Sequence, residues 1–397
     1  MGGRTRRLVA AVLALALMTL PLVGCGSGGG EEPEPAAEEK APYVIGAVLS
    51  LTGTYAGLGE PERNTLEMEV ERINADGGVN GHDIEIIYED DATDAAKAQA
   101  ATVRLIEQED VLAIIGATGT GQTMAMRADI DRAKIPQVSI AGGTVITSQF
   151  DPLVFQTPWS NSIVVPYTLS FIKGKGITKI AVMTDTGGFG TDGLAVIKGA
   201  VAAAGITIVA EQTFNPGDTD MTAQLTKIKA SDAEAVVLWN AGKEAAIVAK
   251  NMKQLGMTQP LFGSHGNART EFITGAEDAA EGFRFAAGKV LLPESYGEGT
   301  PAYDTATGFI DRYTERYGKA PDTFAGHAYD ALYLLVGAMR NLPEDFTAED
   351  IRAELERTQG FVGIGGTFTM SADDHNGLKA SDIVMYEVKD GTWALAE

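Results

Sequence analysis

Cysteine is nearly absent from this 397-residue chain, in which Cys25 is the only one. A lone cysteine cannot pair within the chain, which excludes a disulfide framework, and its place beside an N-terminal leader argues against a thiol catalyst. Basic residues are also scarce. The chain has 31 Lys and Arg but 54 Asp and Glu, which gives a net charge of −23. Since nucleic-acid binding requires a basic surface, we expect no nucleic acid among the partners.

Histidine is equally sparse. The four histidines, His82, His265, His327 and His375, are dispersed and show no metal-ligand spacing. The Gly-x-Ser-x-Gly elbow of the hydrolases is missing as well. We therefore expect no metal, no cofactor and no enzymatic activity, and we interpret His327 in "AGHAYDALYLL" as a packed or capping residue of a helix.

Long apolar runs are missing from the sequence except at its start. The run from Leu8 to Val23 follows Arg4, Arg6 and Arg7, which is the anatomy of a signal peptide, and it ends in "LVGC". This resembles a bacterial lipoprotein signal, so residues 1–24 are expected to be removed and Cys25 to carry lipid. The alternative is a plain secretory signal with an incidental cysteine. Acyl chains contribute about 0.8 kcal/mol per buried methylene and would anchor the protein to a membrane from outside the cytoplasm.

A segment without large apolar residues follows the leader. The stretch "GSGGGEEPEPAAEEKAP" is rich in Gly, Pro and Glu and cannot bury surface. We predict that residues 25–42 form a disordered tether between the lipid and a folded body.

The body, from Tyr43 to Glu397, alternates apolar β-like runs with amphipathic helical stretches. It is too long for one core, and the series restarts near residues 155–180, so we expect two doubly wound Rossmann-like α/β domains. Residues 300–358 should be mainly helical, with "GGTFTM" and "IVMYEVK" as closing strands. The earlier predicted strands are "YVIGAVLS", "DIEIIYED", "VLAIIGA", "QVSIA", "KIAVMTD", "TIVAEQTF", "AVVLWN" and "PLFGSH".

The stretch "IIGATGTGQT", residues 114–123, resembles a phosphate loop. Gly116, Gly121 and Thr123 fit the Gly-x4-Gly-Lys-Ser/Thr spacing, but Gln122 replaces the lysine that binds the outer phosphates. What remains is a strand-to-helix turn of small residues whose free N–H groups and helix dipole favour an anion. A single carboxylate suits this turn better than a triphosphate. The alternative is a tight connection whose glycines serve the backbone alone.

A second nucleotide-like pattern occurs in the other half of the body. Gly188, Gly190 and Gly193 spell Gly-x-Gly-x-x-Gly after a predicted strand, and Glu211 closes the next one. The alternative function is therefore an exported NAD-dependent oxidoreductase, although nicotinamide cofactors are not expected outside the cytoplasm. Measurable NAD binding would favour that alternative.

Several motifs together resemble one protein family. They are "TGTYAGLG", "INADGGVNG", "DDATD", the Gly-rich turn at 116–121, "DTGGFGTDG" and "AGHAYDALYLL". The chain from residue 43 to 390 is similar to the periplasmic solute-binding proteins of branched-chain amino acid ABC importers. The resemblance implies a monomeric two-lobed clamp of the type I periplasmic binding protein fold, with three crossings near residues 155–162, 284–291 and 358–364. It places lobe 1 in residues 43–158 and 287–360, and lobe 2 in residues 159–286 and 361–397.

The resemblance also implies where the ligand binds. In the family, hydroxyl groups and backbone amides of two neighbouring turns hold the ligand carboxylate, and an aromatic–Gly turn of the second lobe faces the cleft. The residues at these places are Thr118, Thr120, Ala141, Gly143, Thr144 and Phe189.

The identity of the solute is where the sequence departs from the family. Amino-acid binders hold the α-ammonium group with an acidic residue, whereas His265 and Asn161 occupy the corresponding positions here. Burying an ammonium group without a carboxylate partner is costly. The solute therefore lacks a free α-ammonium group, or Asp185 or Glu244 substitutes. Further contacts are expected from Tyr55, Trp159, Trp239 and Asn240, as part of an apolar or aromatic wall, or these rings are packing alone.

A third alternative is a ligand-sensing receptor domain. Such a receptor needs a transmembrane or signalling segment after the domain, and none follows "DGTWALAE" in this sequence. We therefore expect delivery of a small carboxylate solute to the membrane subunits of an ABC importer.

Overall fold

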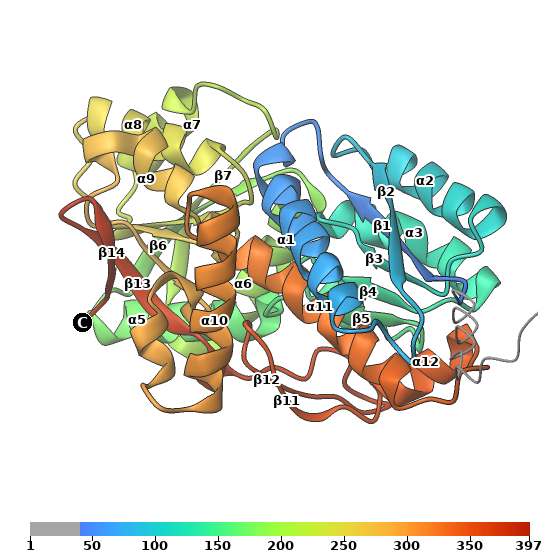
Figure 1. Ribbon diagram of the computed structural model, residues 1–397. Helices are drawn as coiled ribbons and strands as arrows, with labels where there is room; N and C mark the ends of the chain where they lie inside the picture. Colours follow the sequence, from blue (N-terminus) through green and yellow to red (C-terminus); the bar gives the residue numbers. More distant parts are fainter. Residues whose placement is uncertain (1–39) are drawn as a thin grey trace, which may run out of the picture. The chain divides into compact units, whose positions relative to one another are not determined.

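The computed structural model describes residues 40–397, in which the chain forms two lobes, each built on its own sheet (Figure 1). Within these residues the first sheet has five strands in the order β2-β1-β3-β4-β5, and all neighbours are parallel. Its central strands are continuously apolar, as strands buried on both faces are. The bounds are β1 Tyr43–Leu49, β2 Ile84–Asp90, β3 Ala113–Gly116, β4 Gln137–Ser139 and β5 Val154–Gln156.

The second sheet, again counted within residues 40–397, has seven strands in the order β14-β13-β10-β9-β8-β6-β7. Strands β6 to β10 are parallel, and β13 and β14 add an antiparallel edge. The bounds are β6 Lys179–Asp185, β7 Thr207–Phe214, β8 Ala235–Trp239, β9 Leu261–Gly263, β10 Arg284–Ala287, β13 Val384–Lys389 and β14 Thr392–Leu395, and a separate ribbon pairs β11 Gln359–Val362 with β12 Thr367–Thr369.

Both lobes have the same doubly wound design. The parallel order β7-β6-β8-β9-β10 repeats the order β2-β1-β3-β4-β5. In such sheets the connections on the two sides of the first strand leave in opposite directions, and ligands bind beyond the carboxyl ends of the strands at that point. The topology therefore directs attention to the turns after β1 and β3 in one lobe and after β6 and β8 in the other.

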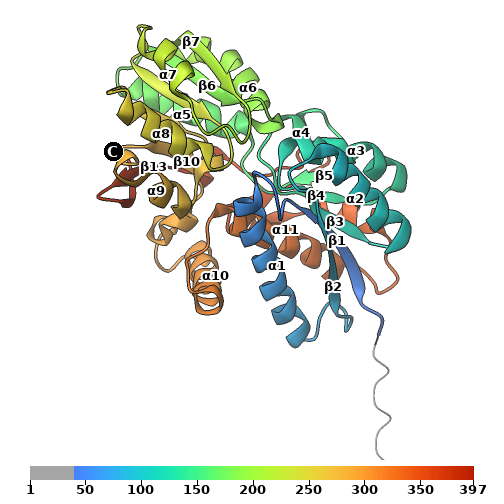
Figure 2. The same ribbon diagram turned by 90° about the horizontal axis from the view of Figure 1, so that it is seen from above.

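Helices cover both faces of each sheet, as seen from above in Figure 2. In the first lobe α1 pairs with α11 and α2 with α3, while in the second α5 pairs with α6 and α7 to α9 follow one another. The bounds are α1 Ala56–Ala75, α2 Ala95–Gln108, α3 Thr120–Ala133, α4 Val145–Ser148, α5 Asn161–Gly174, α6 Gly188–Ala204, α7 Thr222–Lys229, α8 Glu244–Gln254, α9 Thr270–Ala276, α10 Pro301–Tyr317, α11 Thr323–Arg340 and α12 Ala348–Leu355.

The chain passes between the two sheets after β5, after β10 and before β13. Trp159 joins these three passages. Its ring fills the space that a side chain on Gly288 would need, and its Nε1–H donates to the carbonyl of Gly365 at 2.9 Å. The first passage is thereby tied to both of the others, which makes Trp159 a structural residue of the junction.

The third passage is anchored to α11 by a buried carboxyl group. Asp330 accepts the backbone N–H groups of Ile364 at 2.6 Å and Gly365 at 2.7 Å. A Cβ on Gly363 would overlap the same carboxyl group, so glycine permits this approach. Burial raises the pKa of Asp330 to about 8.

The alternation of elements expected from the sequence is confirmed. Each predicted strand is present, the block at 300–358 is helical, and α12 begins with the capping box of Thr347 and Asp350. Strands β5, β10, β11 and β14, each of three or four residues, were not predicted. The leader 1–24, Cys25 and the tether up to residue 39 lie outside the described residues, while 40–42 are exposed and irregular.

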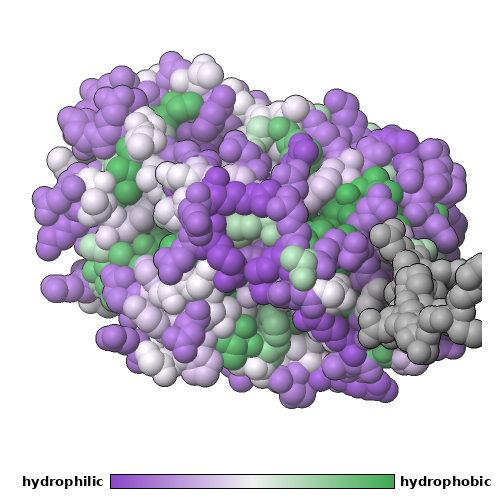
Figure 3. Space-filling view, viewed as in Figure 1, coloured by the Kyte–Doolittle hydropathy of each residue, from purple (hydrophilic) through white to green (hydrophobic). Residues whose placement is uncertain are grey.

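The face of the molecule shown in Figure 3 is mainly hydrophilic, with apolar residues scattered over it. Across residues 40–397, Phe150 and Leu395 are the exposed large apolar side chains. In the same part of the chain, no helix combines the length and the apolar character needed to cross a membrane. Most large apolar side chains pack inside the two lobes instead.

Candidate functional site

A narrow cavity lies at the carboxyl ends of the strands of both sheets. Its volume is about 20 Å³, room for about one water molecule, so the two lobes lie close together around it. A larger solute requires the lobes to part. The lining comes from both lobes: Tyr55, Leu58, Thr118, Gly119, Thr120, Ile140, Ala141, Gly142, Pro158, Phe189, Ala241, His265, Gly266, Phe324 and His327.

The N-terminus of α3 points into this cavity. β3 ends at Gly116, and Gly119 caps α3 without any side-chain hydrogen bond from the described residues. The first N–H groups of a helix have no intrahelical acceptor and carry the positive end of the dipole. The Thr120 hydroxyl is buried and has no hydrogen-bond partner within residues 40–397. The turn thus offers several donors to an acceptor that enters from the cavity.

Thr118 has a different role from Thr120. Its hydroxyl accepts the Ser50 N–H at 3.0 Å and donates to the Glu62 carboxylate at 2.5 Å. Burial raises the pKa of Glu62 well above its ordinary value. Although Thr118 lines the cavity, its hydroxyl already holds the turn in place.

The N-terminus of α6 meets that of α3 beside the cavity. A Cβ on Gly188 would come within 2.6 Å of the Gly121 nitrogen, so the two backbones approach as closely as glycine allows. Unlike the turn before α3, the turn before α6 is already occupied by an acidic side chain, because the Asp185 carboxyl group accepts the Gly187 N–H at 2.7 Å. Burial raises the pKa of Asp185 to about 7. The uncapped turn of α3 is therefore the stronger of the two anion sites.

Besides Tyr55, two histidines supply the other polar side chains of the lining. Both ring nitrogens of His265 and Nδ1 of His327 are buried without a partner among the described residues. Burial lowers the pKa of each histidine to about 3, so both rings are neutral at physiological pH. A neutral imidazole has one donor and one acceptor. Leaving such groups unpaired costs about 1–3 kcal/mol each, which a bound polar group offsets.

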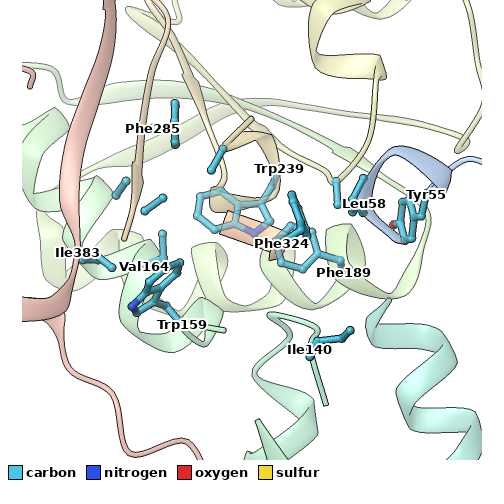
Figure 4. Close-up of a cluster of buried hydrophobic side chains, with 14 of the residues drawn as sticks. Tyr55, Leu58, Ile140, Trp159, Val164, Phe189, Trp239, Phe285, Phe324 and Ile383 are labelled. Carbon is cyan, nitrogen blue, oxygen red and sulfur yellow. The ribbon is translucent and has the colours of Figure 1, made fainter. Parts of the chain in front are cut away.

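Aromatic side chains form the apolar part of the site, as Figure 4 shows. Phe189 lies at the start of α6, and its ring meets His265 edge-on at 5.1 Å. Trp239 stacks behind Phe189 at 6.4 Å and is fully buried. Tyr55 and Phe324 complete the wall from α1 and α11. The cavity therefore pairs one polar turn with an aromatic wall.

Six of the residues singled out from the sequence line the cavity, and six do not. Those in the lining are Tyr55, Thr118, Thr120, Ala141, Phe189 and His265, and those outside it are Gly143, Thr144, Trp159, Asn161, Trp239 and Asn240. His327, interpreted as a packed helix residue, is indeed buried but also faces the cavity.

The residues outside the lining support the site from behind. Asn161 accepts the indole N–H of Trp239 at 2.9 Å. Asn240 anchors the turn after β9 through its backbone carbonyl, which accepts the Ser264 hydroxyl at 2.6 Å. Gly143 leaves space for the Thr120 side chain, which a Cβ there would overlap. These residues hold the lining residues in position.

Hydrogen bonds to one carboxylate group join the two lobes beside the cavity. Asp192 of α6 accepts the Thr144 N–H at 2.7 Å and the Val145 N–H at 3.0 Å, both at the start of α4. Asn161 donates to the same carboxylate at 2.7 Å. We call this set of residues the latch. Sequence reasoning missed Asp192, since it is one of many acidic residues, and it also missed Leu58, Ile140, Pro158 and Phe324.

The two candidates for an ammonium partner lie elsewhere. Asp185 accepts the Gly187 N–H before α6 at 2.7 Å, and Glu244 accepts the Gly217 N–H at 2.8 Å. Neither lines the cavity, and the lining residues, all of them within the described chain, include no acidic side chain.

The Gly-x-Gly-x-x-Gly pattern has a packing explanation. A Cβ on Gly190 would lie 2.6 Å from the Asp185 carboxylate, and one on Gly193 would overlap the Trp239 ring. Glu211 is paired with Lys198 at 2.8 Å. These residues allow α6 to pack closely against the sheet, so dinucleotide binding is not needed to explain the pattern. Within residues 40–397 there is also no cluster of His, Cys, Asp and Glu that could hold a metal ion.

Two similar α/β lobes that close over a small cavity define the class of two-lobed binding proteins. The family model described as periplasmic binding protein matches residues 42–392, and the chain belongs to this family.

Individual relatives agree with this assignment. A leucine-, isoleucine-, valine-, threonine- and alanine-binding protein of Pseudomonas aeruginosa is 27% identical over 85% of this chain and 87% of its own length. The Streptococcus pneumoniae branched-chain amino acid transporter substrate binding protein LivJ, solved in complex with isoleucine, is 27% identical, with a TM-score of 0.80 over 90% of this chain and 99% of its own. An extracellular ligand-binding receptor from Rhodopseudomonas palustris HaA2 shares the fold, with a TM-score of 0.84 over 90% of this chain and all of its own at 23% identity.

Proposed function

We propose that this protein is an extracytoplasmic solute-binding lipoprotein that captures a small carboxylate-bearing solute between its lobes and delivers it to an ABC importer. The uncapped N-terminus of α3, with the unpartnered Thr120 hydroxyl in a narrow and largely apolar cavity, carries this proposal. Charge-assisted hydrogen bonds contribute about 1.5–3 kcal/mol each, and the helix dipole adds up to about 2 kcal/mol in a partly buried site.

The relatives support the transport part of the proposal. Their names describe proteins that bind branched-chain amino acids or serve transporters of them. Since binding proteins of this class close around their ligand by hinge motion, we propose lobe 1 as residues 43–158 and 287–360, and lobe 2 as residues 159–286 and 361–397. The working unit is a monomer with no cofactor, and it is not an enzyme.

A binding screen tests the carboxylate. Full-length protein is heated with leucine, isoleucine, valine, phenylalanine and the hydroxy, oxo and unsubstituted acids of the same skeletons. Each acid has its primary amide as a matched control. A ligand present at 100 times its Kd stabilises the folded state by about 2.7 kcal/mol, so only the acids should raise the melting temperature. An amide that binds as tightly as its acid would refute the proposed anion site.

Anchoring through Cys25 has its own test. Cys25→Ser removes the acceptor of the lipid, so the variant should leave the membrane fraction and appear in the soluble extracytoplasmic fraction. Binding of the solute should not change. If the variant stays with the membrane like the wild type, the lipid proposal fails while solute binding stands.

A further inference from the structure

The polar atoms of the cavity restrict what the solute can carry beside its carboxylate. The lining, which lies wholly within residues 40–397, has no carboxylate of its own, and Asp185 and Glu244 lie outside it, where each accepts a backbone N–H group. Backbone carbonyls of the turn after β4 are engaged as well. Ala141 and Gly143 accept the Gln156 amide at 2.7 and 3.0 Å, and Gly142 accepts the Asn161 N–H at 3.0 Å. An ammonium group would enter this cavity without an anionic partner, which is costly.

His265 lies where the substituent next to the carboxylate would be. A Cβ on Gly142 would overlap Nε2 of His265, and one on the adjacent Gly143 would overlap the Thr120 side chain. Consecutive glycines thus make room for both polar groups on one turn. A carboxylate held by Thr120 and the α3 amides places its α-substituent within reach of the His265 ring.

The two histidines require a partner that both donates and accepts. Each neutral ring has one N–H and one lone pair, and both nitrogens of His265 lack partners in the described chain. His327 lies close enough for charge on His265 to lower its pKa further. An ammonium group offers only donors, whereas a hydroxyl group offers a donor and an acceptor.

We infer that the solute is a 2-hydroxy acid with an apolar, branched or aromatic body, and that His265 and His327 recognise its hydroxyl group in place of an α-ammonium group. This inference rests on the proposed carboxylate site. The aromatic wall of Tyr55, Phe189 and Phe324 receives the body. Import of such acids would supply substrate to an enzyme that oxidises the carbon bearing the hydroxyl group.

Two matched series test the inference by calorimetry on the full-length protein. The first contains leucine, 2-hydroxy-4-methylpentanoate, 4-methyl-2-oxopentanoate and 4-methylpentanoate, and the second contains the four corresponding 3-phenylpropanoate derivatives. Within each series only the α-substituent changes. The hydroxy acid should bind at least tenfold more tightly than the amino acid and the unsubstituted acid in one series or both.

Each of the other possible results would overturn the inference. If the amino acid binds as tightly as its hydroxy acid in the better series, the inference is overturned while solute capture stands. Equal binding of the unsubstituted acid would also overturn it, since no hydroxyl group would then be recognised. If none of the acids binds, the inference and the proposed carboxylate site both fail.

A pair of variants tests the role of His265 directly. His265→Glu supplies the acidic group that amino-acid binders use, so the preference should invert in favour of the amino acid of the same skeleton. His265→Gln is the neutral control and should keep the wild-type order with weaker binding. An unchanged order in a folded His265→Glu protein would overturn the inference. Melting curves establish folding, and if either variant unfolds, the wild-type series alone decides.

Discussion

At the scale of single residues, neighbouring hydroxyl groups have opposite roles. Thr118 donates to buried Glu62 and accepts from Ser50, so its side chain is committed to the fold. The hydroxyl of Thr120 is buried nearby and has no partner from Lys40 onward. Sequence spacing alone gives both threonines the same place in a glycine-rich turn. Only the contacts with Ser50 and Glu62, both distant in the sequence, distinguish them.

Thr120→Val should weaken binding of the tightest acid in the screen at least tenfold, about 1.4 kcal/mol, because it removes one charge-assisted hydrogen bond. The melting temperature without ligand should stay the same or rise, since an unpaired buried hydroxyl is lost. Thr120→Ser keeps the hydroxyl and should restore most of the affinity. Isothermal titration calorimetry measures all three proteins, and unchanged affinity in the Val variant would exclude this turn from the site.

At the scale of elements, α3, α4 and α6 bring the lobes together. The starts of α3 and α6 meet backbone to backbone at Gly121 and Gly188, and Asp192 of α6 holds the start of α4. Two contacts of α6 with the first lobe therefore hold the lobes together, and a separate variant tests each contact.

Gly188→Ala should weaken solute binding at least tenfold, because its Cβ would come within 2.6 Å of the Gly121 nitrogen in the closed form. Gly199→Ala is the matched control in the same helix, since a Cβ there meets no described atom within 4 Å. The control should bind normally and gain up to about 1 kcal/mol of stability from its helix propensity. Equal binding by the two variants would contradict the close approach.

Asp192→Ala should speed dissociation of the solute about tenfold or more and leave the association rate nearly unchanged, because the bonds from Asp192 to the start of α4 join the two lobes and form only when they close. Stopped-flow binding measures both rates. Asp232→Ala, which removes an exposed pair with Lys179, controls for loss of surface charge. A slower association with unchanged dissociation would show that Asp192 acts before closure.

The sequence predicted the elements better than it predicted the site. Apolar strands such as "KIAVMTD" carry a local pattern, and their predicted places are confirmed in β6 and its neighbours. Phe324 and His327 reach the cavity from α11, more than a hundred residues after α6, and only the return of the chain to the first lobe brings them there. Long-range assembly of this kind leaves no local pattern in the sequence.

At the scale of the whole molecule, buried carboxyl groups make stability depend on pH. Burial raises the pKa of Asp330 to about 8 and those of Asp185 and Asp322 to about 7. Raised values favour the protonated folded form, so their contribution is full below the unfolded values near 4 and is lost as pH rises through 7 to 8. Between pH 6.5 and 8 His265 and His327 are neutral in the folded protein, and the carboxyl groups dominate the pH dependence.

Stability should therefore fall from pH 6.5 to pH 8, by up to about 1.4 kcal/mol per pH unit for each carboxyl group that is protonated only in the folded state. Urea unfolding across this range measures the slope. Asp330→Asn should make the slope shallower, whereas Asp373→Asn on the exposed turn should not. A rise in stability over the same range would contradict the burial of these groups as acids.

The position of Trp159 gives the protein a built-in optical reporter. One indole lies where three chain passages cross, another lies behind the cavity wall at Trp239, and the sequence has only three in all. Any opening of the lobes changes the surroundings of the first, and any occupant changes those of the second. Native emission spectra can therefore follow loading in real time without a dye, and replacing each indole with phenylalanine separates the two signals.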